Sequence, residues 1–261
     1  MSPDALAFKI RTRAHWEAID LGLALVQTYW RKLYAAWLVI ALPAVFSALA
    51  LTYLLKDSDN NILYGMGLFW WLKPLYDRVF LHVLSRAVFG ETLGWRGVLR
   101  AIPGLLRHTG LLRALTWGRF SPQRSFKLPI WQLEGVTGRT RSRRLRSLKG
   151  EGAVRLIFVC SAFEMILISG MLGFIFMMLP PEFVPSRLES LSEYFAADKE
   201  LLWLHAIYSF VYLLAISVIE PFYVAAGFAL YLNQRTKLEG WDIELGFRTL
   251  AARLEARQTP S

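Results

Sequence analysis

Acidic side chains inside apolar stretches are the residues of this chain best placed to do chemistry. Glu164 and Glu220 each interrupt a long uncharged run, and an ionised side chain at the centre of a bilayer costs about 2.5–3.5 kcal/mol on insertion scales. Each acid therefore needs a proton or a basic partner, for which Lys73 and Arg78 are the candidates. One hypothesis is a buried structural pair. The other is a proton or ion relay, or a lipid headgroup site.

The residue after Glu220 is a proline, which interrupts the helical hydrogen bonds at this position. Pro221 has no backbone N–H, so the Ser217 carbonyl one turn earlier loses its helical donor. We expect Glu220, beside this break, to accept a hydrogen bond from a neighbouring helix or to bind a cation. If the helices that carry Glu164 and Glu220 run in opposite directions, both acids lie near the middle of the membrane.

A second group of ionisable side chains follows the apolar run ILYGMGLFWWL. Its members are Lys73, Asp77, Arg78, His82 and Arg86. Lys73 and Asp77 are four residues apart, so they share a helix face and can pair. The other three are also spaced by four and lie on a different face. Internal pairing and snorkelling explain the group as structure, whereas a polar cavity or an ion path explains it as function.

Four apolar segments position these residues, each close to the 20 or so residues that a helix needs to cross a bilayer core of about 30 Å. They are Tyr34–Leu55, Ile62–Phe89, Val154–Leu179 and Leu201–Leu232. The composition is 55% hydrophobic and only 19% charged, against about 25% charged in soluble domains. We predict an all-α polytopic membrane helix bundle with four transmembrane helices. The first residues lack a signal-peptide pattern, so we expect the first apolar segment to stay as an anchor.

Positive charge is concentrated in one connection and orients this bundle. Residues 90–153 contain 13 Lys and Arg and three acids, a surplus equal to the formal net charge of +10 of the whole chain. Residues 1–33 and the tail after Leu232 hold five basic residues each, whereas 180–200 holds two against five acids. This alternation predicts that both termini are cytoplasmic. The predicted parts are a cytoplasmic or interfacial N-terminal helix (1–33), a transmembrane hairpin (34–89), a basic cytoplasmic loop (90–153), a second transmembrane hairpin (154–232) and a cytoplasmic amphipathic tail (233–261).

Three further segments have the apolar stripes of amphipathic helices, which lie either at the membrane interface or on the bundle itself. The first stripe is Trp16, Ile19, Leu23, Val26 and Trp30, and the last is Ile243, Phe247, Leu250 and Leu254. Between them, Trp95–Gly118 is apolar and carries four arginines. We expect Gly240 to end the fourth helix as a left-handed cap and Asp242 to begin the tail helix. Small residues are spaced for close helix contact at Ser169 and Gly173, and at Ala225 and Ala229.

The cytoplasmic loop contains a dense basic cluster immediately before the third apolar segment. Its arginines are Arg139, Arg141, Arg143, Arg144 and Arg146. Because the cluster adjoins a membrane helix, we expect anionic lipid or a protein partner to bind it, and no nucleic acid. The preceding segment, Arg119–Gly138, has two prolines and is too apolar for a linker. We expect it to pack on the cytoplasmic face and to dock a partner.

Motifs for catalysis, cofactors and metals are missing from the sequence. The four histidines, at 15, 82, 108 and 205, have no metal-ligand spacing, and Cys160 is the only cysteine. There is no phosphate-binding glycine loop and no GxSxG nucleophile turn. We therefore predict no catalytic residue, no cofactor and no metal.

Three stretches of the chain resemble a known group of proteins. WWLKPLYDRVFLHVLSRAVFGE, RFSPQRSFKLPIWQLEG with its following arginines, and EPFYVAAGFALYLNQRTKLEGWDIELGFR are similar to uncharacterised proteobacterial multi-pass inner-membrane proteins. Those proteins are encoded near MoxR-type ATPase and transglutaminase-like genes. The stretch Pro221–Glu244 also resembles the closing motif of the glycerophosphoryl diester phosphodiesterase membrane domain. The resemblance implies the bacterial inner membrane and an accessory membrane component, and it supplies no catalytic residues.

The sequence thus favours a non-enzymatic inner-membrane scaffold or accessory subunit that docks anionic lipid and a partner protein through its basic cytoplasmic face. The alternative is a small ion-coupled transporter that uses Glu164 and Glu220. A lipid-modifying enzyme is a third hypothesis, which the lack of paired motif carboxylates or histidines disfavours.

Overall fold

A computed structural model describes residues 11–55, 61–91, 93–108, 114–136, 138–178 and 202–240. Every regular element in these ranges is a helix, so the predicted all-α class is confirmed there. In chain order they are α1 (His15–Leu54), α2 (Asn61–Trp71), α3 (Lys73–Val88), α4 (Trp95–His108), η2 (Trp117–Phe120), α6 (Arg124–Gln132), α7 (Gly138–Ser147), α8 (Ala153–Met178) and α10 (Leu202–Glu239). The predicted tail helix, its Asp242 cap and the loop 180–200 lie outside the described residues.

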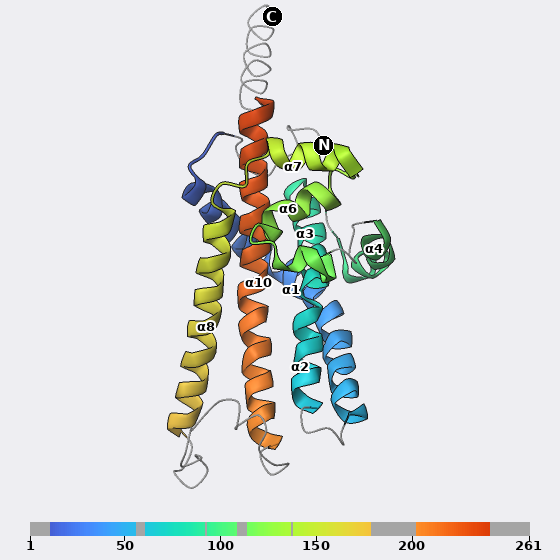
Figure 1. The fold of residues 1–261 in the computed structure, drawn as a ribbon, viewed down its shortest axis with the longest axis vertical. Coiled ribbons are helices and arrows are strands. Elements are labelled where there is room, and N and C mark those ends of the chain that lie inside the picture. The colour runs from blue at the N-terminus through green and yellow to red at the C-terminus, as the bar shows by residue number, and fades with distance from the viewer. Residues whose placement is uncertain are drawn as a thin grey trace, which may run out of the picture.

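Three helices are long and apolar enough to cross a membrane, which indicates a membrane protein. They are α1, α8 and the part of α10 from Ile207 to Glu239. Figure 1 shows α8, α10, α2 and the end of α1 running along the long axis of the molecule. α10 is the central helix, because it packs against α1, α8, α6 and α3. α6 and α7 lie at the end of the bundle where α8 begins (Figure 1).

α1 joins two elements that the sequence predicts separately, the N-terminal helix and the first span. The helix bends at Tyr29, whose φ of −108° and ψ of 16° are not helical. The part before the bend packs on α10, and Gly22 makes this possible. A Cβ there would lie 2.5 Å from the Ala226 Cα. The N-terminal helix therefore belongs to the bundle.

The apolar stripe predicted for this helix is only partly buried. Ile19 and Val26 are buried, but Trp16, Leu23 and Trp30 are exposed. The buried face includes two small residues, Ala18 and Gly22, together with Ile19, Leu25 and Val26. Close approach of two backbones requires small side chains, so the large tryptophans are turned outward.

The second predicted span is two helices, α2 and α3, which meet at Leu72. Pro74 cannot donate to the Trp70 carbonyl, so the helical hydrogen bonds are interrupted there. Arg119 replaces them, donating from Nη2 to the Trp70 carbonyl at 2.7 Å and from Nη1 to the Trp71 carbonyl at 2.8 Å. The Tyr76 hydroxyl donates to the Phe69 carbonyl at 3.2 Å. Backbone acceptors within a membrane need such partners, because water is absent.

α10 continues through its own proline. The Ser217 carbonyl that Pro221 leaves without a helical donor accepts a hydrogen bond of 3.1 Å from the Tyr34 hydroxyl of α1. Trp37 Nε1 donates to Ser217 Oγ at 2.9 Å. At its other end α10 stops where predicted. Gly240 has φ +63° and donates its N–H to the Thr236 carbonyl at 3.0 Å.

The segment predicted to dock a partner folds into the bundle instead. Its buried residues include Ser125, Phe126, Leu128 and Ile130 of α6. α6 approaches α10 closely at Gly227, where a Cβ would lie 2.4 Å from Ser125 Cβ. Most of the apolar side chains of α6 are thus part of the core and are covered by the chain's own helices.

Small residues mark real contacts on α10 but not on α8. Ala225 and Ala229 are both buried, and Ala225 adjoins Gly22 of α1. In contrast, a Cβ on Gly173 of α8 would meet no atom within 4 Å. The spacing of small residues therefore predicts the α1–α10 interface correctly, whereas Gly173 faces open space.

Candidate functional site

Five ionisable side chains from four helices meet inside the bundle, and we call them the ionic cluster. They are Lys73 and Asp77 of α3, Arg124 of α6, Glu164 of α8 and Glu220 of α10. Each of the four helices supplies at least one charge. The cluster therefore links segments that are far apart in the sequence.

Lys73 connects the two intramembrane acids. Its Nζ lies 3.0 Å and 3.1 Å from the two carboxylate oxygens of Glu164. The same Nζ lies 3.3 Å from Oε2 of Glu220. Lys73 is thus one of the two partners that the sequence suggested for the acids, and it binds both Glu164 and Glu220.

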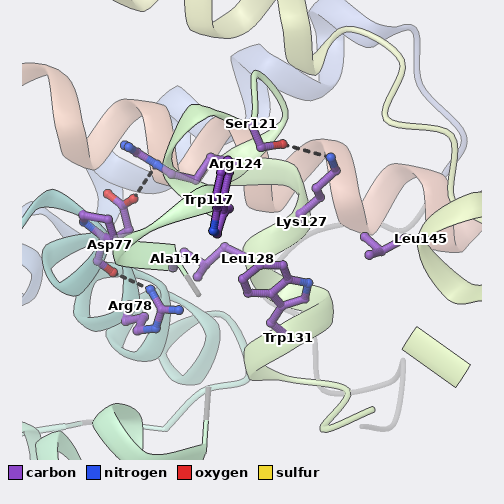
Figure 2. A pocket seen from close by; sticks show the side chains of 12 residues that line it. Asp77, Arg78, Ala114, Trp117, Ser121, Arg124, Lys127, Leu128, Trp131 and Leu145 are labelled. Carbon is purple, nitrogen blue, oxygen red and sulfur yellow. Dashed lines mark hydrogen bonds and ion pairs between the residues drawn. The ribbon is translucent and has the colours of Figure 1, made fainter. Parts of the chain in front are cut away.

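Arg124 supplies the second bridge, between Asp77 and Glu220. Its Nη2 donates to Oε1 of Glu220 at 2.9 Å, and its Nε lies 3.0 Å from Oδ2 of Asp77. Figure 2 shows the Arg124 guanidinium reaching toward Asp77. Burial by itself would lower the pKa of Arg124, but the Asp77 and Glu220 carboxylates outweigh it and raise the pKa above its usual value. Arg124 therefore stays charged and holds both acids.

Burial makes these pairings necessary. The side chains of Asp77 and Glu220 are only 1% and 3% exposed, while Glu164 is 18% exposed. An unpaired charge at the first two positions would cost several kcal/mol, of order 3–5 when one partner of a buried pair is lost. Glu164 is the member of the cluster most open to its surroundings.

Two more arginines lie beside the cluster. Arg78 is buried and donates from Nη1 to the Pro74 carbonyl at 2.6 Å, and its own carbonyl accepts from Gln132 of α6 at 2.8 Å. Arg119 is buried against the ring of Trp70, with its guanidinium carbon 3.4 Å from the ring centroid. Lys73, Arg78 and Arg119 are thus buried cations, and Arg124 is a partly buried one.

The depth of the ionic cluster can be followed along α8 and α10, the two helices that carry Glu164 and Glu220. Glu220 is 18 residues beyond Leu202, or about 27 Å along α10 at 1.5 Å per residue. Glu164 is 14 residues before Met178, or about 21 Å along α8. A hydrocarbon core of about 30 Å that starts at those helix ends would stop near the cluster. Counted in this way, Glu220 lies close to the far boundary of such a core and Glu164 about 9 Å inside it. The near-central depth that the sequence suggested for the two acids stays a prediction.

Two cavities flank Arg124. The first, of about 340 Å³, reaches Lys73, Glu164 and Glu220 and has an apolar margin. Its lining also includes Trp70, Arg119, Phe120, Cys160, Ser161 and Met165. The second, of about 200 Å³, lies between α3 and α6 (Figure 2). Asp77 and Arg78 line it from α3, and Lys127, which donates to the Ser121 hydroxyl at 2.9 Å, lines it from α6.

Several predicted site residues fall elsewhere. The expected Lys73–Asp77 pair is replaced by two longer-range pairs, to Glu164 and Glu220 and to Arg124. His82 is partly buried on α3, outside the cluster. Arg86 is exposed and pairs with Glu91 at 3.1 Å. None of these contacts brings His82 or Arg86 to the two acids.

Arg124 and Arg119 are site residues that the sequence did not predict. Both stand in the apolar, proline-containing stretch RFSPQRSFKLPIW. A charge in a segment that is itself expected to be buried needs a partner of opposite sign or a backbone acceptor. That rule holds for this loop as well as for the spans, and it identifies both arginines.

The basic cluster of α7 divides into two sets. Arg144 pairs with Glu134 at 2.9 Å and with Glu239 of α10, and the hydrogen bonds that it donates to these carboxylates raise its pKa. Arg141 stacks over Trp131, 5.1 Å from the ring centroid. The other three, Arg139, Arg143 and Arg146, are exposed. Only this second set is available to a ligand on the surface.

Comparisons with known proteins add nothing to the geometry. No family model, curated protein or solved structure matches this chain. Within the described residues, no group of three or more His, Cys, Asp or Glu side chains is arranged to hold a metal ion. The resemblance to proteobacterial inner-membrane proteins stays a prediction.

Proposed function

We propose that this protein is a non-enzymatic scaffold or accessory subunit of a membrane complex in the bacterial inner membrane. In this proposal α2 and α3 together complete a fourth crossing, and both termini are cytoplasmic. The exposed arginines Arg139, Arg143 and Arg146 dock anionic lipid and a partner protein. The charge alternation of the loops supports this topology.

The observation that carries the proposal is the double pairing of Arg124 with Asp77 and Glu220. It attaches the cytoplasmic loop to the spans through buried, charge-assisted bonds, which are stronger than neutral ones. Arg144 adds a second attachment, from α7 to α10 through Glu239. A loop fixed at two points presents its exposed arginines in one arrangement, as a docking surface requires.

Purification of the tagged full chain from native membranes, with quantitative mass spectrometry, tests the proposal. We expect a partner protein at a stoichiometric ratio. Replacement of Arg139, Arg143 and Arg146 together by Gln should release it, because these side chains are exposed and make no contact with the ionic cluster. Replacement of Arg96 and Arg100 of α4 by Gln is the matched control, since both are also exposed basic residues. Partner recovery that is equal in both variants, or no stoichiometric partner at all, contradicts the proposal.

A second candidate function is ion-coupled transport, and one observation favours it. The larger cavity touches both Glu164 and Glu220, and a cavity that reaches intramembrane acids is the usual route for a coupled ion. Proteoliposomes that contain a pH-sensitive dye distinguish the two functions. Proton uptake that Glu220→Gln abolishes, in a variant that still assembles, would replace the scaffold by a transporter.

A further inference from the structure

The larger cavity has one charged side and one apolar side. Lys73, Arg119 and Glu164 lie on the charged side. On the apolar side lie Phe120 and Met165, which are 75% and 62% exposed. A cavity with these two sides matches an amphiphile, with a polar group inside and hydrocarbon at the margin.

Arg119 gives the charged side its preference for an anion. Both of its terminal nitrogens are used by the Trp70 and Trp71 carbonyls. Its Nε is buried and has no acceptor among the described residues. Arg119 as a whole is only 6% exposed. A buried N–H without an acceptor costs about 1–3 kcal/mol, and a phosphate oxygen is the acceptor that a guanidinium binds best.

The acids of the cavity do not oppose such a ligand. Glu164 is bound at both oxygens by Lys73, and Glu220 is bound by Lys73 and Arg124. Three cations, Lys73, Arg119 and Arg124, line this cavity against two carboxylates, Glu164 and Glu220, which leaves a surplus of one positive charge. The single negative charge of a phosphodiester balances that surplus.

The depth of the cavity fits a headgroup. Glu220, on its wall, is about 27 Å along α10 from Leu202, close to the thickness of a hydrocarbon core of about 30 Å. Beyond the margin of the cavity, α8 presents further exposed apolar side chains toward Met178, among them Phe174 and Met177. The volume of about 340 Å³ holds a headgroup but not its acyl chains, which would follow these side chains.

We propose that this cavity binds the phosphate of a phospholipid headgroup beside Arg119, with the acyl chains leaving past Phe120 and Met165 along α8. The proposal concerns residues other than the exposed arginines of α7 and does not depend on the scaffold function. It requires only that the bundle lies in a bilayer.

Photolabelling of the purified full chain tests this site. The probe is phosphatidylglycerol with a photoactivatable group on an acyl chain near the glycerol. We expect labelled peptides from α8 around Met165 and from α2 around Trp70. Unlabelled phosphatidylglycerol should compete, whereas diacylglycerol, which lacks the phosphate, should not.

Met165→Trp is the test variant, because it narrows the margin and leaves every charge in place. Arg119 is unsuitable, since it also holds the joint between α2 and α3. We expect Met165→Trp to reduce labelling at these peptides by about tenfold. Ile166→Trp is the matched control, because Ile166 is equally exposed on α8 but does not line the cavity. It should label like the parent chain.

Four outcomes overturn the proposal. Labelling that avoids these peptides, or that Met165→Trp leaves unchanged, shows that the cavity is not the site. Equal competition by diacylglycerol shows that the phosphate is not recognised. Equal competition by glycerol 3-phosphate or inorganic phosphate shows that the cavity takes a free phosphate compound in place of a lipid.

Discussion

The guanidinium of Arg124 binds the carboxylate of Glu220 at 2.9 Å, although the first stands in the basic loop and the second in the last apolar helix. Both side chains are largely buried, and Nε of the same guanidinium lies 3.0 Å from Oδ2 of Asp77 in a second ion pair. The loop and the helices are therefore held together by charge. Substitutions at this junction should affect the whole bundle.

Arg124→Met should destabilise the protein by about 3–5 kcal/mol, because it leaves two buried carboxylates without one of their partners. Unfolding of the full chain in mild detergent, followed by a thiol-reactive dye at Cys160, measures the change. Lys127→Met is the matched control. It lies one turn along α6 and donates to the Ser121 hydroxyl, outside the ionic cluster, so we expect a smaller loss than for Arg124→Met. Equal losses in the two variants would show that the arginine pairs are not the important contacts.

The two intramembrane acids should differ in their sensitivity to neutralisation. Glu220→Gln removes a charge that faces both Lys73 and Arg124, whereas Glu164→Gln removes one that faces Lys73 alone and is more exposed. We expect a loss of about 2–4 kcal/mol for Glu220→Gln and about 1 kcal/mol for Glu164→Gln. Thermal unfolding of both variants at one detergent concentration shows which substitution causes the larger loss of stability. The reverse order would contradict the pairing described for Lys73.

Close contact between α1 and α10 depends on Gly22. A methyl group there would lie 2.5 Å from the backbone of Ala226, so Gly22→Ala should force the helices apart and cost about 1–3 kcal/mol. Gly173→Ala is the control, because no atom lies within 4 Å of a Cβ at that position on α8. That change should be neutral or stabilise the helix by about 0.5–1 kcal/mol. Circular dichroism melts of the two variants should move in opposite directions.

Local rules predicted the features that depend on neighbours in the sequence. The end of α10 at Gly240 follows from the freedom of glycine at positive φ. The Ser217 carbonyl lacks a helical donor because Pro221 has no backbone N–H. Three of the four apolar segments are long enough to span a membrane as single helices. These results need no knowledge of the tertiary fold.

Features that depend on tertiary contacts could not be predicted in the same way. Lys73 and Asp77 satisfy the i,i+4 rule, yet acids on α8 and α10 and an arginine on α6 are their partners. The exposed face of α1 carries Trp16 and Trp30 because α10 meets the small side of that helix at Gly22. In both cases the position of a neighbouring helix determines which side chains pair or become buried. The sequence of a single helix does not reveal that position.

Tyr34→Phe tests whether the proline break in α10 is supported from outside, as the hydrogen bond of 3.1 Å to the Ser217 carbonyl implies. Loss of the hydroxyl leaves that acceptor without a donor in an environment with no water, so we expect a loss of about 1–2 kcal/mol. Tyr64→Phe is the matched control, since Tyr64 is 48% exposed and should change stability by less than about 0.5 kcal/mol. Hydrogen exchange of the full chain adds a local measurement: amides near Pro221 should exchange faster in Tyr34→Phe, and amides of α8 should not. Uniform acceleration in both helices would mean that the hydroxyl supports the bundle as a whole and not the proline break.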